Sequence, residues 1–280
     1  MRKMDVKTIT TAVRDLCIKA NIYLGEDVKK AFFRAKEGEA SPIGREVLQQ
    51  LIQNAEIAEK EEMPICQDTG MTVVFVELGQ DVALYGGNIA EAIHEGVRQG
   101  YREGYLRKSV VEDPLLRKNT GDNTPAIIYY DIVPGDQIKI TVAPKGFGSE
   151  NMSRIKMLKP SDGVKGVIDF VVDTVSEAGS NPCPPVVVGV GIGGTMEKAA
   201  LMAKKALTRK IGSQHSVGHL RELEETLFKK INGLGIGPQG LGGSTTALAV
   251  HVETFPTHIA GLPVAVNINC HAARHEEIIL

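Results

Sequence analysis

Residues 185–207 read PVVVGVGIGGTMEKAALMAKKAL and contain the clearest structural pattern in the chain. A short run of β-branched residues leads into a glycine loop, and the segment after Thr195 has the apolar spacing of a helix. A strand, a tight glycine turn and a helix are therefore predicted in direct succession. Working outward from this unit, we expect helices and sheets to be mixed along the chain.

The glycines of this stretch match a dinucleotide-binding pattern. Gly189, Gly191 and Gly194 have the spacing G-x-G-x-x-G after a strand and before a helix. That pattern also requires an acidic residue at the end of a second strand, about 20 residues later. Residues 208–211 read TRKI and supply none. We therefore interpret the glycines as a tight strand-to-helix turn and exclude a dinucleotide site.

The rest of the chain predicts a mixed α/β (α+β) fold. A helical opening over residues 1–60 is broken near Gly25 and Pro42, and a mixed-sheet part follows over residues 61–280, within one domain spanning 1–280. We predict strands over 71–79 and 264–270, helices over 88–106, 162–178 and 218–232, and a hairpin over 126–146 that turns at Pro134-Gly135-Asp136. A charged tail is expected after the last strand.

Composition excludes several classes of function. The chain is 42% hydrophobic and 24% charged with a formal net charge of -2, and no basic face suited to nucleic acid is evident. The amino terminus lacks the pattern of a secretory signal, and no apolar run has the length of a bilayer span. We expect a cytoplasmic protein with no membrane contact, in which the four cysteines are not paired as disulfides.

Three of the cysteines lie in stiff loop sequences. Cys66 is in PICQDTG, Cys183 in NPCPP and Cys270 in NINCH, whereas Cys17 falls on the apolar stripe of the first helix and is interpreted as a small buried residue. Each of the three, taken alone, is most simply an incidental thiol. As a set, they suggest a metal centre assembled by the fold, because their wide spacing excludes a local Cys-x-x-Cys zinc knuckle.

These motifs resemble a known family. PICQDTG, KGFGSEN, NPCPPVVVGVGIGGT and NINCHAARH are similar, in that order, to motifs of the amino-terminal region of the class I fumarase and tartrate dehydratase family. The resemblance covers nearly the whole chain. It implies that Cys66, Cys183 and Cys270 bind a 4Fe–4S cluster that leaves one iron open. An open iron can act as a Lewis acid on a substrate hydroxyl group.

The resemblance also implies roles for residues beside the first cysteine. It assigns Gln67 and Asp68 to substrate binding and Asp68 to proton transfer, either as the base or as the group that orients it. The ordinary interpretation of Asp68 is that it caps the turn before Thr69 and Gly70.

Further substrate contacts are implied at Arg107, Gly146, Gly148 and His258. Arginine and backbone amides are suited to binding the carboxylates of a dicarboxylate. The simpler interpretations are a solvated charge for Arg107 and a structural histidine for His258. His271 and Arg274, which follow the third cysteine, are interpreted as support for the ligands or as charge balance at a subunit interface.

The function implied by the resemblance is that of a hydro-lyase subunit. Single-chain members of the family carry a second, carboxy-terminal domain, and this sequence ends at HEEIIL soon after the third cysteine motif. We therefore expect an alpha subunit that converts fumarate reversibly to L-malate only with a smaller beta subunit, in an α2β2 assembly. The alternative substrate is L(+)-tartrate. The cysteines are also compatible with a zinc-dependent hydrolase, which would use them with a histidine, and with a non-enzymatic iron–sulfur module.

Overall fold

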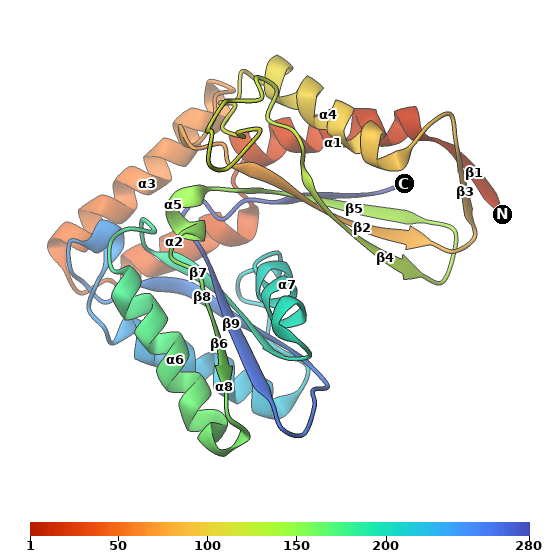
Figure 1. The fold of residues 1–280 in the computed structure, drawn as a ribbon. Coiled ribbons are helices and arrows are strands. Elements are labelled where there is room, and N and C mark those ends of the chain that lie inside the picture. Colours follow the sequence, from red (N-terminus) through yellow and green to blue (C-terminus); the bar gives the residue numbers. More distant parts are fainter. The chain divides into compact units, whose positions relative to one another are not determined.

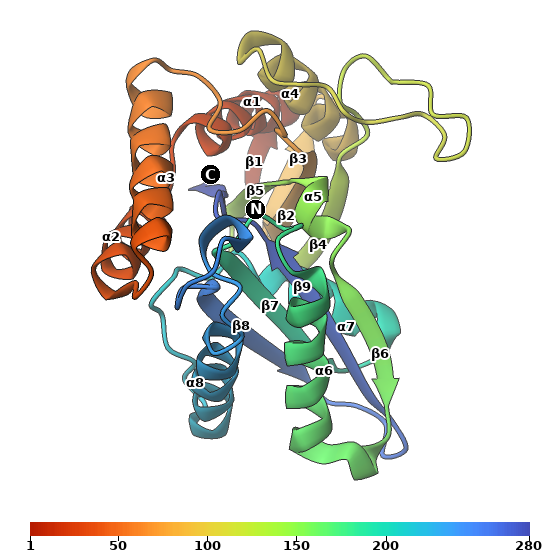
Figure 2. The ribbon, with the colours of Figure 1, turned by 90° about the vertical axis from the view of Figure 1, so that its left-hand side faces the viewer.

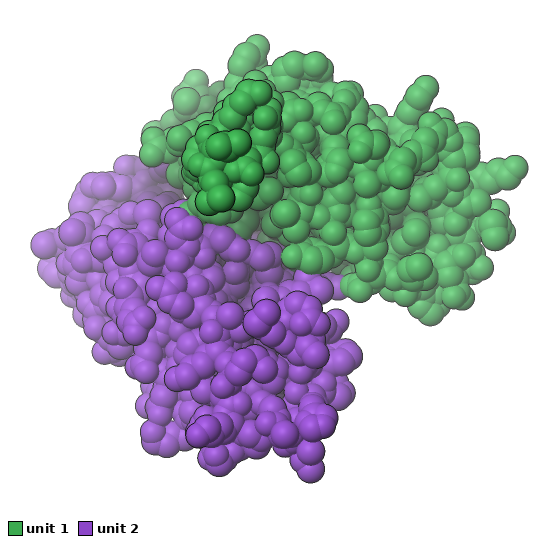
Figure 3. Space-filling view, viewed as in Figure 1, with its two compact units in different colours: residues 1–24, 55–147, 274–280 green, residues 25–54, 148–273 purple.

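The computed structural model of the protein describes residues 1–280 (Figures 1 and 2). It divides into two compact units, which are coloured separately in Figure 3. Unit 1 consists of Met1–Leu24, Ala55–Phe147 and Arg274–Leu280, and unit 2 consists of Gly25–Asn54 and Gly148–Ala273. Helices accompany a mixed sheet in both units, which confirms the predicted fold class. A single domain over residues 1–280 stays a prediction.

Residues 1–60 are mostly helical, as predicted. The helices are α1 Val6–Ile22, α2 Glu26–Gly38 and α3 Pro42–Lys60. The breaks fall near Gly25 and Pro42, where glycine and proline interrupt the helical spacing. The sequence pattern did not predict β1, Arg2–Asp5, which pairs in parallel with β3, Val82–Tyr85.

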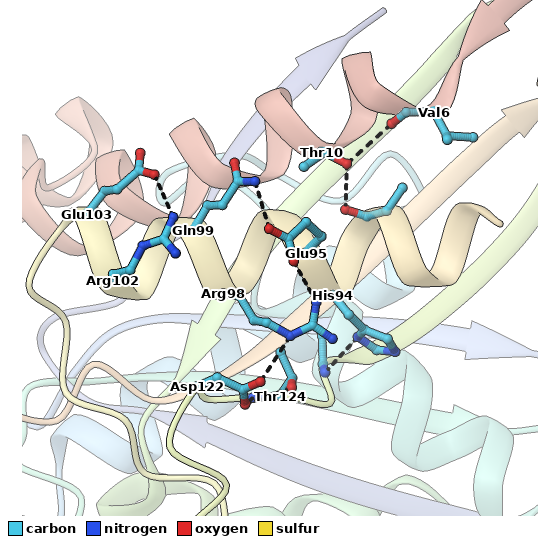
Figure 4. Close-up of polar contacts among 12 residues, drawn as sticks. Val6, Thr10, His94, Glu95, Arg98, Gln99, Arg102, Glu103, Asp122 and Thr124 are labelled. Atoms are coloured by element: carbon cyan, nitrogen blue, oxygen red, sulfur yellow. Dashed lines mark hydrogen bonds and ion pairs between the residues drawn. The ribbon is translucent and has the colours of Figure 1, made fainter. Parts of the chain in front are cut away.

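Unit 1 is built on a four-stranded sheet in the order β10-β5-β2-β4. The strands are β2 Met71–Gly79, β4 Ile127–Val133, β5 Ile138–Lys145 and β10 Glu276–Ile279. α1 and α4, Ile89–Glu103, share a core with these strands. The two helices pack closely because α4 has glycines at the contact: a Cβ at Gly96 would lie 2.7 Å from Thr10 O. Thr10 Oγ1 also donates to Ala92 O at 3.0 Å (Figure 4).

The predicted hairpin over residues 126–146 is wrong in its pairing. Both strands form, but β2 lies between them, parallel to β4 and antiparallel to β5. The predicted turn passes around the end of β2, where Gly79 N donates to Gln137 O at 2.8 Å and Asp81 N donates to Gly135 O at 3.0 Å. Local spacing predicts strands and turns, but it does not reveal a strand inserted from a distant part of the sequence.

The charged tail predicted after the last strand is also wrong. Glu276–Ile279 forms β10, which pairs antiparallel with β5 at the edge of the unit 1 sheet. Residues 276–279 read EEII, so charged and apolar side chains do not alternate and the sequence gives only a weak strand pattern. Lys139 and Glu277 form an ion pair of 2.9 Å across this edge.

Unit 2 is built on a second four-stranded sheet in the order β6-β9-β7-β8. The strands are β6 Arg154–Leu158, β7 Val186–Gly193, β8 Ala247–Phe255 and β9 Leu262–Asn269. Helices α6, Gly163–Ala178, and α8, Gly218–Asn232, cover one face, and α7, Met196–Ala206, covers the other (Figures 1 and 2). The predicted helices over 162–178 and 218–232 and the last predicted strand are confirmed.

The glycines of β7 allow α7 to approach the sheet. A Cβ at Gly189 or Gly191 would lie 2.1 Å from Ala203 O or Ala199 O of the helix, respectively. Gly194 adopts φ +67 in the turn before α7, a conformation that favours glycine. The predicted strand, turn and helix are therefore confirmed, and two of the three glycines serve helix–sheet contact rather than the turn.

Short elements complete the fold. They are the helix α5 Phe147–Glu150 and the 3-10 turns Pro160–Asp162 and Pro238–Gly240. None of the helices combines the length and the apolar character needed to cross a membrane.

Glu39, between α2 and α3, is a buried carboxylate with 1% of its surface exposed. Its oxygens accept hydrogen bonds from the backbone amides of Ser41 (2.9 Å), Ser244 (2.7 Å) and Thr245 (2.8 Å). Burial alone would raise the pKa of Glu39, but these hydrogen bonds outweigh burial and lower the pKa. The carboxylate thereby ties the glycine-rich segment before β8 to the helical opening within unit 2.

Glu39→Gln is expected to lower the free energy of unfolding by about 2 kcal/mol at neutral pH, because an amide nitrogen cannot accept these bonds. Since the folded-state pKa of Glu39 is lowered, its contribution is present above the unfolded pKa of about 4.3 and is lost as the pH falls through the folded value. The difference between wild type and Glu39→Gln should therefore shrink in denaturant titrations below about pH 4. The exposed Glu37→Gln is the matched control, and a pH-independent difference would contradict the assignment.

Candidate active site

Cys17 differs from the other cysteines in its environment. Its side chain is fully buried in the core of unit 1. Burial raises the pKa of its thiol to about 12. A metal ligand must be a thiolate, so Cys17 is not a candidate. Cys66, Cys183 and Cys270 all retain accessible surface.

The segment from Cys66 to Gly70 forms a loop that leads into β2. Asp68 N donates to Cys66 Sγ at 3.4 Å. Asp68 Oδ1 accepts from Gly70 N at 3.0 Å, which is the turn-capping role expected of an ordinary loop aspartate. Asp68 Oδ2 accepts from Phe147 N at 2.9 Å, from a segment distant in sequence. Both oxygens of the carboxylate are thus oriented by backbone amides.

Three side chains of unit 1 hold the carbonyl groups of this loop. The bonds run from Arg274 Nη2 to Asp68 O, from Tyr101 Oη to Thr69 O (2.6 Å) and from Asn123 Nδ2 to Gly70 O (3.2 Å). Sequence reasoning missed Tyr101 because it lies on the apolar stripe of α4, where an aromatic residue predicts core. It also missed Asn123, whose neighbours GDNTP predict only a turn.

Arg107 and Gly146 lie at the same loop. Thr69 Oγ1 donates to Arg107 O at 2.8 Å. A Cβ at Gly146 would lie 3.1 Å from Asp68 Oδ2. Gln67 and the Arg107 side chain are exposed. Unit 1 therefore brings four of the predicted substrate contacts to one loop, namely Gln67, Asp68, Arg107 and Gly146.

Arg107 begins a long loop, residues 107–124, that is fixed to α4 at its far end (Figure 4). Arg98 on α4 forms ion pairs with Glu95 at 2.7 Å and with Asp122 at 3.0 Å. Asn123 Oδ1 accepts two backbone amides from the start of the loop. The loop is consequently held at both ends, at the Arg107 carbonyl by Thr69 and at Asp122 by Arg98.

Cys183 and Cys270 lie on neighbouring loops of unit 2. Cys183 precedes β7 and Cys270 follows β9, and the antiparallel pairing of these strands brings the two ends together. His271 N donates to Cys183 O at 3.2 Å. A Cβ at Gly148 would lie 3.8 Å from Asn181 O on the first of these loops. Two of the three predicted ligands are thus neighbours in unit 2, and Cys66 belongs to unit 1.

Gln239 joins these two loops and was missed by sequence reasoning. Its backbone N and its Nε2 both donate to Pro184 O, at 2.7 and 2.9 Å, and Nε2 lies 3.2 Å from His271 Nδ1. Gln239 and Cys183 both have φ +53. Left-handed backbone is uncommon outside glycine and persists where surrounding contacts enforce it, often at functional sites. The glycine-rich run around Gln239 was its only sequence signal.

His258 lies at the opposite end of the unit 2 sheet from Cys183 and Cys270. It is exposed in the loop between β8 and β9, whereas Cys270 follows the last residue of β9. A strand of eight residues such as β9 spans about 26 Å. Within unit 2, His258 therefore does not lie near Cys183 or Cys270. A substrate contact by His258 stays a prediction.

The accessible thiols are suited to an iron–sulfur cluster. Cysteine thiolates are the usual ligands of such clusters, and three of them leave one iron of a 4Fe–4S cluster open. Cys183 is exposed and Cys66 and Cys270 are partly exposed, so each sulfur is accessible to a metal centre. Within either unit, no three His, Cys, Asp or Glu side chains form a group that could hold a single metal ion.

Comparison with known proteins identifies the family. The family model of fumarate hydratase (Fumerase) matches residues 10–279. The chain belongs to the fumarate hydratase family and is therefore a hydro-lyase. The family suggested by the cysteine motifs is confirmed.

Named relatives match along nearly their full length. A protein of Methanocaldococcus jannaschii named "Putative L(+)-tartrate dehydratase subunit alpha" is 47% identical over 272 residues, which is 95% of this chain and 95% of the relative. The L(+)-tartrate dehydratase subunit alpha of Escherichia coli strain K12 is 34% identical over 283 residues, covering 100% of this chain and 93% of the relative. Both relatives are named as alpha subunits.

Proposed function

We propose that this chain, together with a smaller beta subunit, catalyses the reversible hydration of fumarate to L-malate. The observation that carries the proposal is the family match over residues 10–279, together with the loop after Cys66, in which Asp68 N bonds Cys66 Sγ and Thr69 bonds the backbone of Arg107. A second candidate is the dehydration of L(+)-tartrate, because the relatives are named for that activity. Both reactions add or remove water between two carboxylates. Family membership favours both over a zinc-dependent hydrolase.

The proposed cofactor is a 4Fe–4S cluster bound by Cys66, Cys183 and Cys270. When bound, it supplies an open iron that acts as a Lewis acid on the substrate hydroxyl group. The accessibility of these three thiols and the burial of Cys17 support this ligand set.

The chain's own residues are proposed to bind and orient the substrate. Gln67, Arg107 and the backbone at Gly146 and Gly148 offer donors for carboxylate oxygens. Asp68 is proposed to take part in proton transfer at the carbon next to a carboxylate. The amides of Gly70 and Phe147 support this role, because each donates to one carboxylate oxygen of Asp68. Each oxygen keeps a further lone pair that can take up a proton.

Further contacts complete the proposal. His258 is retained as a substrate contact, and the partner subunit is proposed to supply the remaining cationic groups for the dicarboxylate. An α2β2 assembly in the cytoplasm is the expected form.

The direct test is to purify the chain anaerobically with its partner subunit and to measure iron, sulfide and visible absorbance. The complex is then assayed for hydration of fumarate and for dehydration of L(+)-tartrate. A brown complex that hydrates fumarate supports the first candidate, and one that acts only on tartrate supports the second. A colourless zinc protein inert towards both would overturn the proposal.

Replacing the cysteines one at a time tests the ligand set. Cys66→Ala, Cys183→Ala and Cys270→Ala should each lose most of the iron and sulfide, because a cluster needs all three thiolates. Cys17→Ala is the matched control and should retain the iron content of wild type. Equal iron in all four variants, measured on anaerobically reconstituted complexes, is incompatible with the assignment.

Asp68→Asn tests the role in proton transfer. The amide keeps the size of the side chain but cannot take up a proton, and its nitrogen cannot accept one of the two backbone bonds. We therefore expect at least about a 100-fold loss of kcat with the cluster retained. Hydration rate and iron content should be measured on the same sample. If Asp68→Asn keeps the wild-type kcat, Asp68 takes no part in proton transfer.

A further inference from the structure

Arg274 is a buried arginine in the segment between β9 and β10. Only 4% of its surface is exposed. Its Nη2 donates to Asp68 O, in the loop that follows Cys66. Its Nε and Nη1 are buried and have no hydrogen-bond partner. Buried N–H groups are nearly always satisfied, so these two nitrogens require an explanation.

No carboxylate of the chain is paired with the Arg274 guanidinium. None of its nitrogens is hydrogen-bonded to a carboxylate of the chain, and both oxygens of the nearby Asp68 accept from amides. Tyr101 is close enough to be affected by the charge of Arg274, but burial raises the pKa of its phenol and keeps it neutral. An arginine stays cationic at accessible pH. A buried water could satisfy the N–H groups, but it would not balance the charge.

We propose that Arg274 is an anion-binding residue whose guanidinium balances the negative charge brought to the loop after Cys66 when the site is loaded. This inference rests on the proposed function, which supplies two anions of suitable chemistry. One is the cluster with its thiolate ligands, and the other is a substrate carboxylate. Both accept the directed N–H bonds that an arginine provides.

The position of Arg274 in the chain supports this role. It follows Cys270 closely in sequence, and it is bonded to the backbone two residues after Cys66. Its one satisfied bond orients the guanidinium on the cysteine loop and leaves two nitrogens for a ligand. A purely structural arginine would be expected to use those nitrogens within the chain.

The test uses the complex with the partner subunit and has two arms. In the first arm, the cluster-loaded complex without substrate is mixed with an iron chelator, and the rate of iron release is measured. In the second arm, the cluster-free complex, which cannot turn over, is titrated with L-malate in a calorimeter. The variants are Arg274→Met, which keeps the length but removes the charge, and Arg274→Lys, which keeps the charge without the planar donors. The exposed Arg102→Met is the matched control.

If Arg274 binds the cluster, Arg274→Met should release iron on the order of tenfold faster than wild type or Arg102→Met. If it binds the substrate carboxylate, the Kd for L-malate should rise on the order of tenfold instead. Arg274→Lys should fall between Met and wild type in the affected arm. Circular dichroism of each complex checks that the variants are folded, and Arg274→Lys serves as the test if Arg274→Met is not.

Wild-type behaviour of both Arg274 variants in both arms would overturn the inference and leave a buried water as the partner of the guanidinium. That outcome would not affect the proposed function, because the wild-type complex would still load the cluster and hydrate its substrate. A wild-type complex that takes up no iron and binds no dicarboxylate would refute the proposed function and this inference together.

Discussion

The loop after Cys66 depends on hydrogen bonds to its carbonyl groups. Arg274, Tyr101 and Asn123 donate to three successive carbonyl oxygens, so the backbone of the loop is fixed from inside unit 1. The Asp68 carboxylate is held separately, by the amides of Gly70 and Phe147. A loop attached only by its ends would let Asp68 sample many rotamers, and ordering it at each turnover would cost free energy.

In unit 2, strand pairing determines where the loops of Cys183 and Cys270 lie. β7 and β9 run antiparallel, so the loop before one and the loop after the other must meet, and Cys183 and Cys270 are on those loops. Gln239 links the two loops through Pro184 and His271. Helix α7 packs against the same two strands, and Gly189 and Gly191 permit its close approach. The placement of the two loops thus follows from the pairing of the strands that they flank.

Much of the secondary structure could be predicted from sequence because it depends on local spacing. The breaks at Gly25 and Pro42 and the helix after Thr195 are examples. The pairing partner of β4 and β5 could not be predicted, because both strands pair with β2, which comes from a distant part of the sequence. The site divides along the same line: the cysteine motifs locate the loops of the proposed ligands, but only the structure shows that two buried nitrogens of Arg274 have no hydrogen-bond partner. His258 illustrates the converse, since proximity in sequence to Cys270 does not place it near that residue.

The interleaving of the two units has a consequence for biosynthesis. On the ribosome, Cys66 and Asp68 emerge early, but Arg274 and β10, which belong to the same unit, emerge only with residues 274–280. Unit 1 therefore cannot reach its final form while those residues are still in the exit tunnel. The proposed cluster would meet an incompletely ordered loop before that point, so cofactor insertion is expected only after residues 274–280 have left the tunnel.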